Sequence, residues 1–258
     1  MKIVASDFDG TLFYKDKCVS QDDLDSIARW QTAGNMFGIA TGRGLSLIMK
    51  RLRQFKVPFD FLVCTNGATI FDAKLQVLSS HPMPVLAMPT LLDEPIVRKS
   101  HYILFFTTRE AMIYRPYEEF KNDLKELEIP EINVHDMHQL QDVIQVSLLY
   151  SAIEETMQAR DILQKKFVNI FHINRNRCFI DITIDGIDKG VGLQEMLQLQ
   201  HWEKEPLLTI GDDENDLPML ERFYGYTVRS AMPIIRQKVI KVYDSVGSLL
   251  DDQIELKE

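Results

Sequence analysis

Short apolar runs alternate with amphipathic helical patterns over the first quarter of the chain. Apolar positions follow helical spacing after Ser20, a predicted N-cap, up to Gly34, a predicted C-terminal cap, and again over 45–52. The predicted buried strands are the apolar runs at 2–8, 36–41 and 61–65. Short connections between strand, helix and strand predict a parallel sheet with crossover helices.

The pattern changes after the proline-rich stretch 82–95. Alternating apolar residues then predict several strands, including a hairpin around Arg109 and Glu110, together with two helices. The predicted strands lie at 101–107, 111–114, 144–150, 167–173 and 178–184. The predicted helices lie at 117–127 and 153–165. We therefore expect an α+β segment with an antiparallel sheet and helices on one of its faces.

The α/β rhythm returns near residue 186. The predicted elements are a helix at 189–199, a strand at 207–210, a helix at 217–222, a strand at 226–228 and a helix at 233–239. The sequence thus predicts an α/β protein whose core is a doubly wound, Rossmann-like parallel sheet. Residues 1–83 and 185–258 are expected to form this core, and 84–184 to form an inserted α+β domain.

Composition narrows the class of protein. The 258-residue chain is 45% hydrophobic and 26% charged, the balance of a soluble globular protein. Its net charge of −9 argues against nucleic-acid binding, which uses basic patches. No apolar run approaches the roughly 18 residues of a membrane span. The cysteines Cys18, Cys64 and Cys178 form no C-x-x-C pair, which favours a reducing compartment, so we expect a cytoplasmic protein.

The strongest chemical signal is the segment 7–12, DFDGTL, at the end of the first predicted strand. Ligands of parallel sheets bind outside the carboxyl ends of the strands. Strand alternation would point Asp7 and Asp9 to the same side if the strand continued that far. Two carboxylates there suit a hard cation, or a division of work between a nucleophile and an acid/base. A plain Asp-Gly turn with a spare aspartate is the simpler alternative.

A second signal is the segment 211–216, GDDEND, directly after the predicted strand at 207–210. Four carboxylates in five residues repel one another, and a divalent cation would relieve that repulsion. A solvated acidic first turn of the next helix explains the same residues, because the helix dipole favours negative charge there. An EF-hand loop starting at Asp212 is excluded, since Leu217 stands where that loop needs glycine.

Two weaker signals also lie at helix starts. Thr41 and Gly42 end the second predicted strand, where a hydroxyl and backbone N–H groups can cradle a phosphate, although an ordinary helix start looks the same. Lys189 opens a helix, where a cation opposes the helix dipole. That placement indicates a charged ligand, and a solvated lysine is the simpler alternative.

Together, these segments resemble the four signatures of the haloacid dehalogenase-like phosphohydrolases, specifically the Cof-type subfamily with a large inserted cap. The residues that carry the four signatures are 7–12, Thr41, Lys189 and 211–216. The triplets at 66–68, NGA, and 188–190, DKG, also resemble local patterns of the Cof group. The resemblance spans the whole chain, including the position and size of the cap.

The resemblance implies a role for each signature. Asp7 would be the nucleophile that takes the phosphoryl group as an aspartyl-phosphate, and Asp9 would be the acid/base. A Mg²⁺ ion would be bound by Asp7, by the backbone carbonyl of Asp9 and by Asp212, with Asp216 supporting these ligands. The residues that would hold the phosphate are Thr41, Gly42, Lys189 and Asn215.

The expected function is that of a Mg²⁺-dependent phosphatase, a phosphoric monoester hydrolase, for small phosphorylated metabolites, with sugar phosphates as the expected substrates. One alternative is a phosphotransferase or phosphomutase that shares the aspartyl-phosphate. Another is a non-catalytic sensor, which would have no use for the acid/base Asp9. We expect no nucleic-acid or membrane partner, and a monomer or weak homo-oligomer. The sequence identifies neither the substrate nor the residues within 84–184 that select it.

Overall fold

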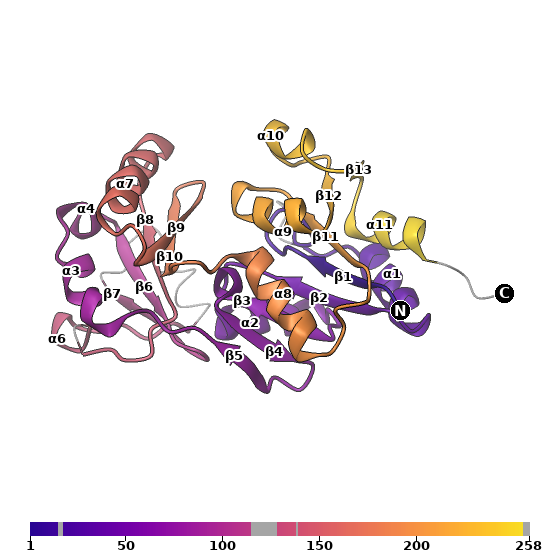
Figure 1. Ribbon diagram of the computed structural model, residues 1–258, viewed down its shortest axis with the longest axis horizontal. Coiled ribbons are helices and arrows are strands. Elements are labelled where there is room, and N and C mark those ends of the chain that lie inside the picture. The colour runs from indigo at the N-terminus through magenta and orange to yellow at the C-terminus, as the bar shows by residue number, and fades with distance from the viewer. Residues whose placement is uncertain (15–17, 115–127, 138, 255–258) are drawn as a thin grey trace. The chain divides into compact units, whose positions relative to one another are not determined.

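The computed structural model describes residues 1–14, 18–114, 128–137 and 139–254. Contacts within the chain divide it into two compact units (Figure 1). Unit 1 comprises Met1–Thr41, Arg51–Ser79 and Asp188–Glu258, and unit 2 comprises Gly42–Lys50 and Ser80–Ile187. The helix predicted at 117–127 lies outside the described residues. Among the helices that are described, none is long and apolar enough to cross a membrane.

Unit 1 is built on an eight-stranded sheet in the order β13-β12-β11-β1-β2-β3-β4-β5. Its strands are β1 (Ile3–Ser6), β2 (Met36–Ala40), β3 (Phe61–Cys64), β4 (Thr69–Asp72), β5 (Val77–Ser80), β11 (Leu207–Gly211), β12 (Tyr224–Val228) and β13 (Lys241–Tyr243). The neighbours from β13 to β3 pair in parallel, whereas β4 is antiparallel to β3. The predicted parallel core sheet is confirmed. The sequence pattern did not reveal β4, β5 and β13.

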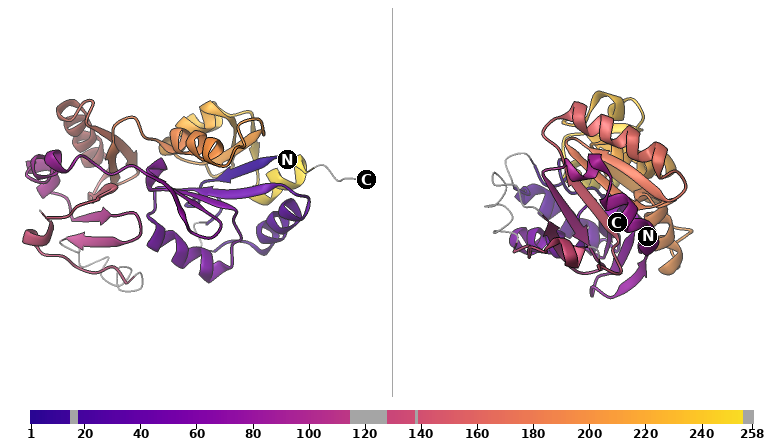
Figure 2. Two further views of the ribbon diagram at one scale, coloured as in Figure 1. Left: turned by 60° about the horizontal axis from the view of Figure 1, so that its bottom comes forward. Right: turned by 90° about the vertical axis from the view of Figure 1, so that its left-hand side faces the viewer.

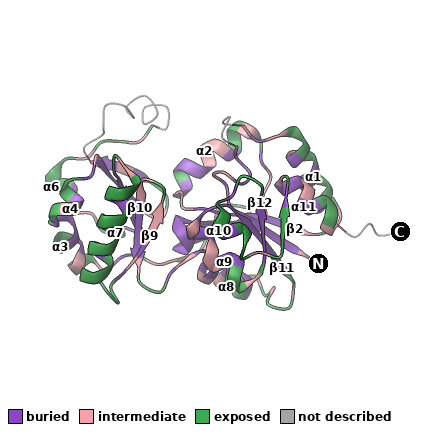
Figure 3. Cartoon of the chain, turned by 90° about the horizontal axis from the view of Figure 1, so that it is seen from above, coloured by how far each residue is buried: buried purple, intermediate pink, exposed green. Residues whose placement is uncertain are grey.

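Helices cover both faces of this sheet, which is why its central strands β1 and β3 are buried throughout. The helices of unit 1 are α1 (Gln21–Thr32), α8 (Lys189–Leu199), α9 (Leu217–Arg222), α10 (Pro233–Arg236) and α11 (Val246–Gln253), and α2 (Leu45–Phe55) is divided between the two units at Arg51. Figure 2 shows α1 and α8 on opposite sides of the sheet, and Figure 3 shows the sheet buried and the outer helix surfaces exposed. The register places Ile3 of β1 beside both Met36 and Leu207, so the carboxyl ends of β1, β2 and β11 are neighbours.

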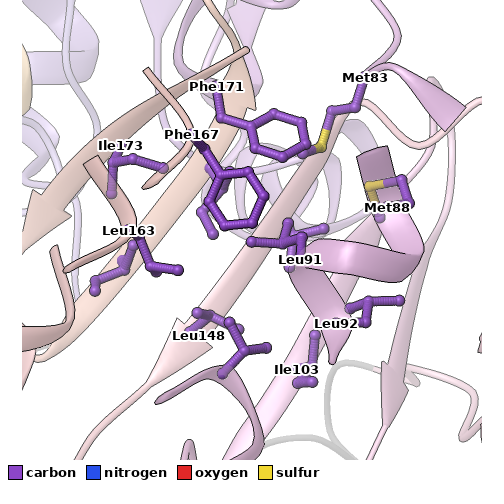
Figure 4. Packing of buried hydrophobic residues seen from close by; sticks show 14 of the residues in the cluster. Met83, Met88, Leu91, Leu92, Ile103, Leu148, Leu163, Phe167, Phe171 and Ile173 are labelled. Carbon is purple, nitrogen blue, oxygen red and sulfur yellow. The ribbon is translucent and has the colours of Figure 1, made fainter. Parts of the chain in front are cut away.

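Unit 2 contains a five-stranded sheet in the order β7-β6-β8-β10-β9, with every neighbouring pair antiparallel. Its strands are β6 (Tyr102–Phe106), β7 (Ala111–Tyr114), β8 (Gln145–Leu149), β9 (Phe171–Asn176) and β10 (Phe179–Ile184). Its helices are α3 (Met88–Leu92), α4 (Pro95–Arg98), α6 (Val134–Met137) and α7 (Ile153–Lys166). The predicted α+β character is confirmed. One face of the sheet packs against helices through a cluster that includes Leu91, Leu148 and Leu163 (Figure 4).

The opposite face of the unit 2 sheet carries a buried polar chain among its apolar residues. Ser147 Oγ donates to Asp181 Oδ1 at 2.5 Å, and Gln145 Nε2 donates to Ser147 Oγ at 3.0 Å. Gln145 Nε2 also donates to the carbonyl of Gly42 at 3.0 Å. These side chains are buried, so the hydrogen bonds satisfy groups that would otherwise cost free energy.

The strand predicted at 167–173 begins four residues late. Helix α7 continues to Lys166, the N–H of Phe167 donates to the Leu163 carbonyl at 2.9 Å, and Asn169 is left-handed. Phe167 and Phe171 both enter the cluster of Figure 4, with ring centroids 5.3 Å apart. A helix end followed by a turn places both rings inside this cluster, whereas an apolar run of this length predicts a single strand from the sequence alone.

A buried carboxylate fixes the start of α1. Ser20 is the predicted N-cap and accepts a hydrogen bond from the Asp23 N–H at 3.1 Å. Asp23 is fully buried, and its carboxylate accepts hydrogen bonds of 2.6 Å each from Tyr14 Oη, Ser20 Oγ and the Gly247 N–H. This first-turn acid therefore joins α1 to the chain after β1 and to the start of α11.

We predict that Asp23→Ala lowers the free energy of unfolding of unit 1 by about 3 kcal/mol, because three donors lose a charged acceptor. Urea denaturation followed by tryptophan fluorescence measures this, since both tryptophans, Trp30 and Trp202, lie in unit 1. The control is Asp25→Ala on the exposed side of the same helix, which should change stability by less than about 0.5 kcal/mol. Equal effects of the two substitutions would contradict this role of Asp23.

Candidate functional site

Four of the predicted site residues meet at the carboxyl ends of β1 and β11. Asp7 directly follows β1, and its N–H donates to the Ile210 carbonyl at 2.8 Å, which continues the pairing with β11 by one residue. Asp212 directly follows β11, and Asp216 ends the short helix η4 (Glu214–Asp216). Lys189 is the first residue of α8. Residues far apart in the sequence are therefore held within one small region of unit 1.

The three aspartates form a compact set of oxygen ligands. One carboxylate oxygen from each of Asp7, Asp212 and Asp216 lies within 4.8 Å of the others, and all three residues are buried. Gly10 makes room for this set, since its φ is +94° and a Cβ there would lie 2.4 Å from Asp212 Oδ2. Thr11 Oγ1 donates to Asp212 Oδ1 at 3.0 Å. Hard cations such as Mg²⁺ prefer oxygen ligands of this kind.

A fully buried ammonium group partly neutralises the carboxylates. Lys189 Nζ donates to Asp7 Oδ1 and to Asp216 Oδ1, both at 2.6 Å, and its side chain is 0% exposed. Burial by itself would lower the pKa of Lys189, but the charges of Asp216 and Asp7 outweigh burial and raise that pKa above its ordinary value. The solvated lysine that was the simpler alternative from the sequence is wrong.

The carboxylates nevertheless outnumber the ammonium. Burial is the largest cause that raises the pKa of Asp7 well above its ordinary value, followed by the charge of Asp216, and Lys189 only partly opposes them. Asp212 and Asp9 add smaller contributions in the same direction. A bound divalent cation would supply the missing positive charge, so the chemistry of the site fits a metal ion.

The acidic turn after β11 is buried and hydrogen-bonded. Asp216 Oδ2 accepts from the N–H groups of Asp212 and Asp213, at 2.9 and 3.1 Å, while its other oxygen accepts from Lys189. Asp213 Oδ1 accepts from the Glu214 N–H at 2.6 Å. Asp212, Asp213 and Asp216 are all buried, so a fully solvated first turn is wrong. Asp216 thus accepts three hydrogen bonds, one from Lys189 and two from backbone N–H groups of the turn.

The structure also places the other four predicted site residues, three of them in unit 1 and one in unit 2. Asp9 is half-buried, and its charge acts on Asp7. Thr41 is buried at the end of β2, next to β1. Asn215 is buried in the acidic turn, and its Nδ2 donates to Asn66 Oδ1 at 3.2 Å. Gly42 belongs by its contacts to unit 2.

Two residues that contact the predicted site received no role from the sequence. Thr11 donates to Asp212, and Asn66 contacts Asn215. Thr11 lies inside the 7–12 signature, and Asn66 directly follows the predicted strand at 61–65, at the same edge of the sheet. Their position at strand ends was a usable signal. The identity of their hydrogen-bond partners could not be predicted, because those partners lie 201 and 149 residues away in the sequence.

Comparison with known proteins places the chain in one family. Residues 4–247 match the family described as haloacid dehalogenase-like hydrolase. The chain is 26% identical over 227 residues to the 5-amino-6-(5-phospho-D-ribitylamino)uracil phosphatase YitU of Bacillus subtilis, covering 85% of this chain and 83% of that protein. It is 24% identical over 232 residues to the pyridoxal phosphate phosphatase YbhA of Escherichia coli, covering 85% and 84%.

A solved structure shows the same fold. A HAD/COF-like hydrolase from Plasmodium vivax superposes with a TM-score of 0.85 at 23% sequence identity, covering 100% of this chain and 96% of the other. At this identity the likeness concerns the fold, with its parallel core sheet and second antiparallel sheet.

We predict that Lys189→Met lowers the free energy of unfolding of the metal-free protein by about 3–5 kcal/mol, because the buried carboxylates lose their only described ammonium partner. Denaturation followed by tryptophan fluorescence measures the loss. Burial and the charge of Asp216 raise the pKa of Asp7, and Lys189 opposes them. Without Lys189 this pKa rises further, so the folded variant takes up a proton more readily than the folded native protein, and the deficit should narrow as the pH falls.

The matched control is Lys238→Met, which breaks an ion pair with Glu221 in which both side chains are largely exposed. This substitution should cost less than about 1 kcal/mol. If Lys189→Met cost no more than this control at neutral pH, the buried lysine would not be what holds the cluster together.

Proposed function

The chain belongs to the haloacid dehalogenase-like hydrolase family, and on this premise we propose that it is a Mg²⁺-dependent phosphatase for small phosphorylated metabolites. The observation that carries the proposal is the buried cluster of Asp7, Asp212 and Asp216 with Lys189 at the carboxyl ends of parallel strands. Phosphoryl transfer requires in-line positioning and neutralisation of the charged oxygens. An oxygen-ligated cation beside a lysine supplies both.

Asp7 and Asp212 would bind the metal ion together with the backbone carbonyl of Asp9, while Asp216 holds Lys189 and the backbone of the acidic turn. When bound, Mg²⁺ neutralises charge on the phosphoryl oxygens and fixes the position of the phosphate. The three hydrogen bonds that Asp216 accepts favour a supporting role, in which Asp216 orients the metal-binding residues without binding the ion itself. This division of the three aspartates is part of the proposal.

Asp7 acts as the nucleophile. One carboxylate oxygen is held by Lys189, and this contact fixes the direction in which the other oxygen can attack. The Asp7 oxygen forms a bond to phosphorus while the ester P–O bond breaks, and Asp9 gives a proton to the leaving oxygen. In the second step a water oxygen attacks the same phosphorus, Asp9 takes the proton, and the bond to Asp7 breaks to release inorganic phosphate.

Lys189, Thr41 and Asn215, all in unit 1, hold the phosphate. An ammonium group has three N–H donors, and Lys189 uses two of them on Asp7 and Asp216. The third remains for a phosphoryl oxygen. A hydroxyl at Thr41 and an amide at Asn215 add neutral donors, which hold the negatively charged transition state without further charge.

The substrate class is inferred from the relatives. The two curated relatives are named for a phosphoribitylamino-uracil and for pyridoxal phosphate, and both compounds are phosphate monoesters of small molecules. We propose substrates of this kind and include sugar phosphates, which the sequence led us to expect. A phosphotransferase or phosphomutase would share the aspartyl-phosphate, but it would not release inorganic phosphate in proportion to the substrate consumed.

We predict that the protein releases inorganic phosphate from at least one member of a panel of phosphorylated ribityl compounds, pyridoxal phosphate and sugar phosphates. Asp7→Asn should lower kcat by more than about 1000-fold, because an amide does not attack phosphorus. The variant should stay folded, since it removes one negative charge from a cluster in which carboxylates outnumber the ammonium group. The control Asp25→Asn, on an exposed surface, should retain full activity. A folded Asp7→Asn variant with normal turnover would refute the nucleophile assignment.

We also predict that exhaustive chelation abolishes phosphate release and that Mg²⁺ restores it, with Ca²⁺ a poor substitute. Mg²⁺ holds six ligands at about 2.1 Å, whereas Ca²⁺ takes more ligands at longer distances. The nucleophilic carboxylate would then be aimed poorly. A phosphate-release assay across a metal titration measures the effect, and full activity of the chelated protein would exclude a metal-dependent mechanism.

A further inference from the structure

The turn that follows β3 has an unusual backbone. Thr65, Asn66 and Gly67 have φ values of +49°, +52° and +102° in succession. The left-handed region costs little for glycine and asparagine, but it is unfavourable for a β-branched threonine. All three residues are buried, and Thr65 Oγ1 lies 2.8 Å from Thr69 Oγ1, within hydrogen-bond distance. A strained turn of this kind persists only where its surroundings hold it.

This turn contacts three segments that carry proposed phosphate ligands. The Asn66 N–H donates to the Thr41 carbonyl at 3.0 Å, and Asn66 Oδ1 accepts from Asn215 Nδ2 at 3.2 Å. Gly67 packs so closely on the residue before Lys189 that a Cβ at this position would lie 2.1 Å from the Asp188 carbonyl oxygen. The turn thus joins Thr41, Lys189 and Asn215, all within unit 1.

The side-chain contact has a specific chemical consequence. The amide of Asn215 has two N–H donors at one end and a carbonyl acceptor at the other, and rotation about its last torsion exchanges them at little cost. An anion would be repelled by the carbonyl end. Since Asn66 Oδ1 accepts one N–H, it holds the amide in the orientation that leaves the second N–H for another acceptor.

We propose that Asn66 is a positioning residue of this site, which makes Asn215 present an N–H to the phosphoryl group and anchors Thr41 through the backbone. The inference rests on the proposed function, because it takes Asn215 as a phosphate ligand. It adds a residue that touches neither the reacting atoms nor the metal. The left-handed turn places the Asn66 side chain and its N–H so that they reach two different segments.

The first test is a double-mutant cycle. Asn66→Gly removes the acceptor and tolerates the left-handed backbone. It should lower kcat/KM by about 10-fold to 100-fold and weaken competitive inhibition by inorganic phosphate to a similar extent. Asn66→Gly combined with Asn215→Ala should lose no more than Asn215→Ala alone, because both variants abolish the same donor to phosphate. Losses that multiply in the double variant would overturn the inference.

The control for this cycle is Asn35→Gly. The Asn35 side chain accepts a hydrogen bond from the Lys2 N–H at 2.9 Å in the same unit, outside the site. This substitution also removes an asparagine acceptor, and it should leave kcat/KM and phosphate inhibition unchanged. Tryptophan fluorescence checks that each variant is folded.

A second measurement does not depend on activity. The side-chain NH₂ resonances of Asn215, assigned by their loss in Asn215→Ala, should show one hydrogen-bonded proton in the ¹H–¹⁵N spectrum of the native protein. In Asn66→Gly that proton should shift to the position of a water-exposed amide. An unchanged pair of resonances would overturn the inference even if the enzyme is active.

If Asn66→Gly does not fold, Asn66→Asp takes its place, because aspartate also tolerates the left-handed backbone and its carboxylate accepts the same hydrogen bond. The resonance of the hydrogen-bonded Asn215 NH₂ proton should then stay at its native position, while the added negative charge weakens inhibition by phosphate. Loss of that resonance position would count against the inference. An inactive native protein would refute the proposed function and leave the amide contact testable by its resonances. An active enzyme with an unaffected Asn66→Gly variant would refute only the role of Asn66.

Discussion

A single buried ammonium between buried carboxylates is the interaction on which the site depends. Lys189 bonds to Asp7 after β1 and to Asp216 after β11, so it joins two neighbouring strands of the core sheet at their carboxyl ends. Taking such charges out of water is costly, and only close pairing compensates for that cost. The glycine at position 10 and the hydrogen-bonded acidic turn keep the partners close together.

The sheet topology makes this pairing possible. Parallel strands place their carboxyl ends at one edge, so residues that directly follow β1, β2, β3 and β11 become neighbours although the chain between them is long. The residues of unit 2 occupy most of the interval between β5 and β11. The pairing of β1 with β11 is nevertheless continuous, and Asp7 extends it by one hydrogen bond.

The cluster also shows how stability and chemistry oppose each other at this site. Burial and carboxylate repulsion raise the pKa of Asp7, which means that the ionised form is disfavoured until more positive charge arrives. A site optimised for stability would have balanced charges or apolar residues. The excess of negative charge suits the proposed cation, and the same excess is the reason that we expect Lys189 to stabilise the folded state.

The sequence alone predicted the parallel core, most of its strands and the signatures at 7–12 and 211–216, because these depend on local periodicity and on residues close together in the chain. It did not reveal β4, β5 and β13. It left open whether Lys189 and the acidic turn were solvated, and it gave Asn66 no role. Those answers depend on burial and on partners up to 182 residues away, which only the tertiary structure brings together. Hydrophobic patterning records which face of an element is buried, but the contacts that a buried charge or amide makes are set by the packing of distant segments.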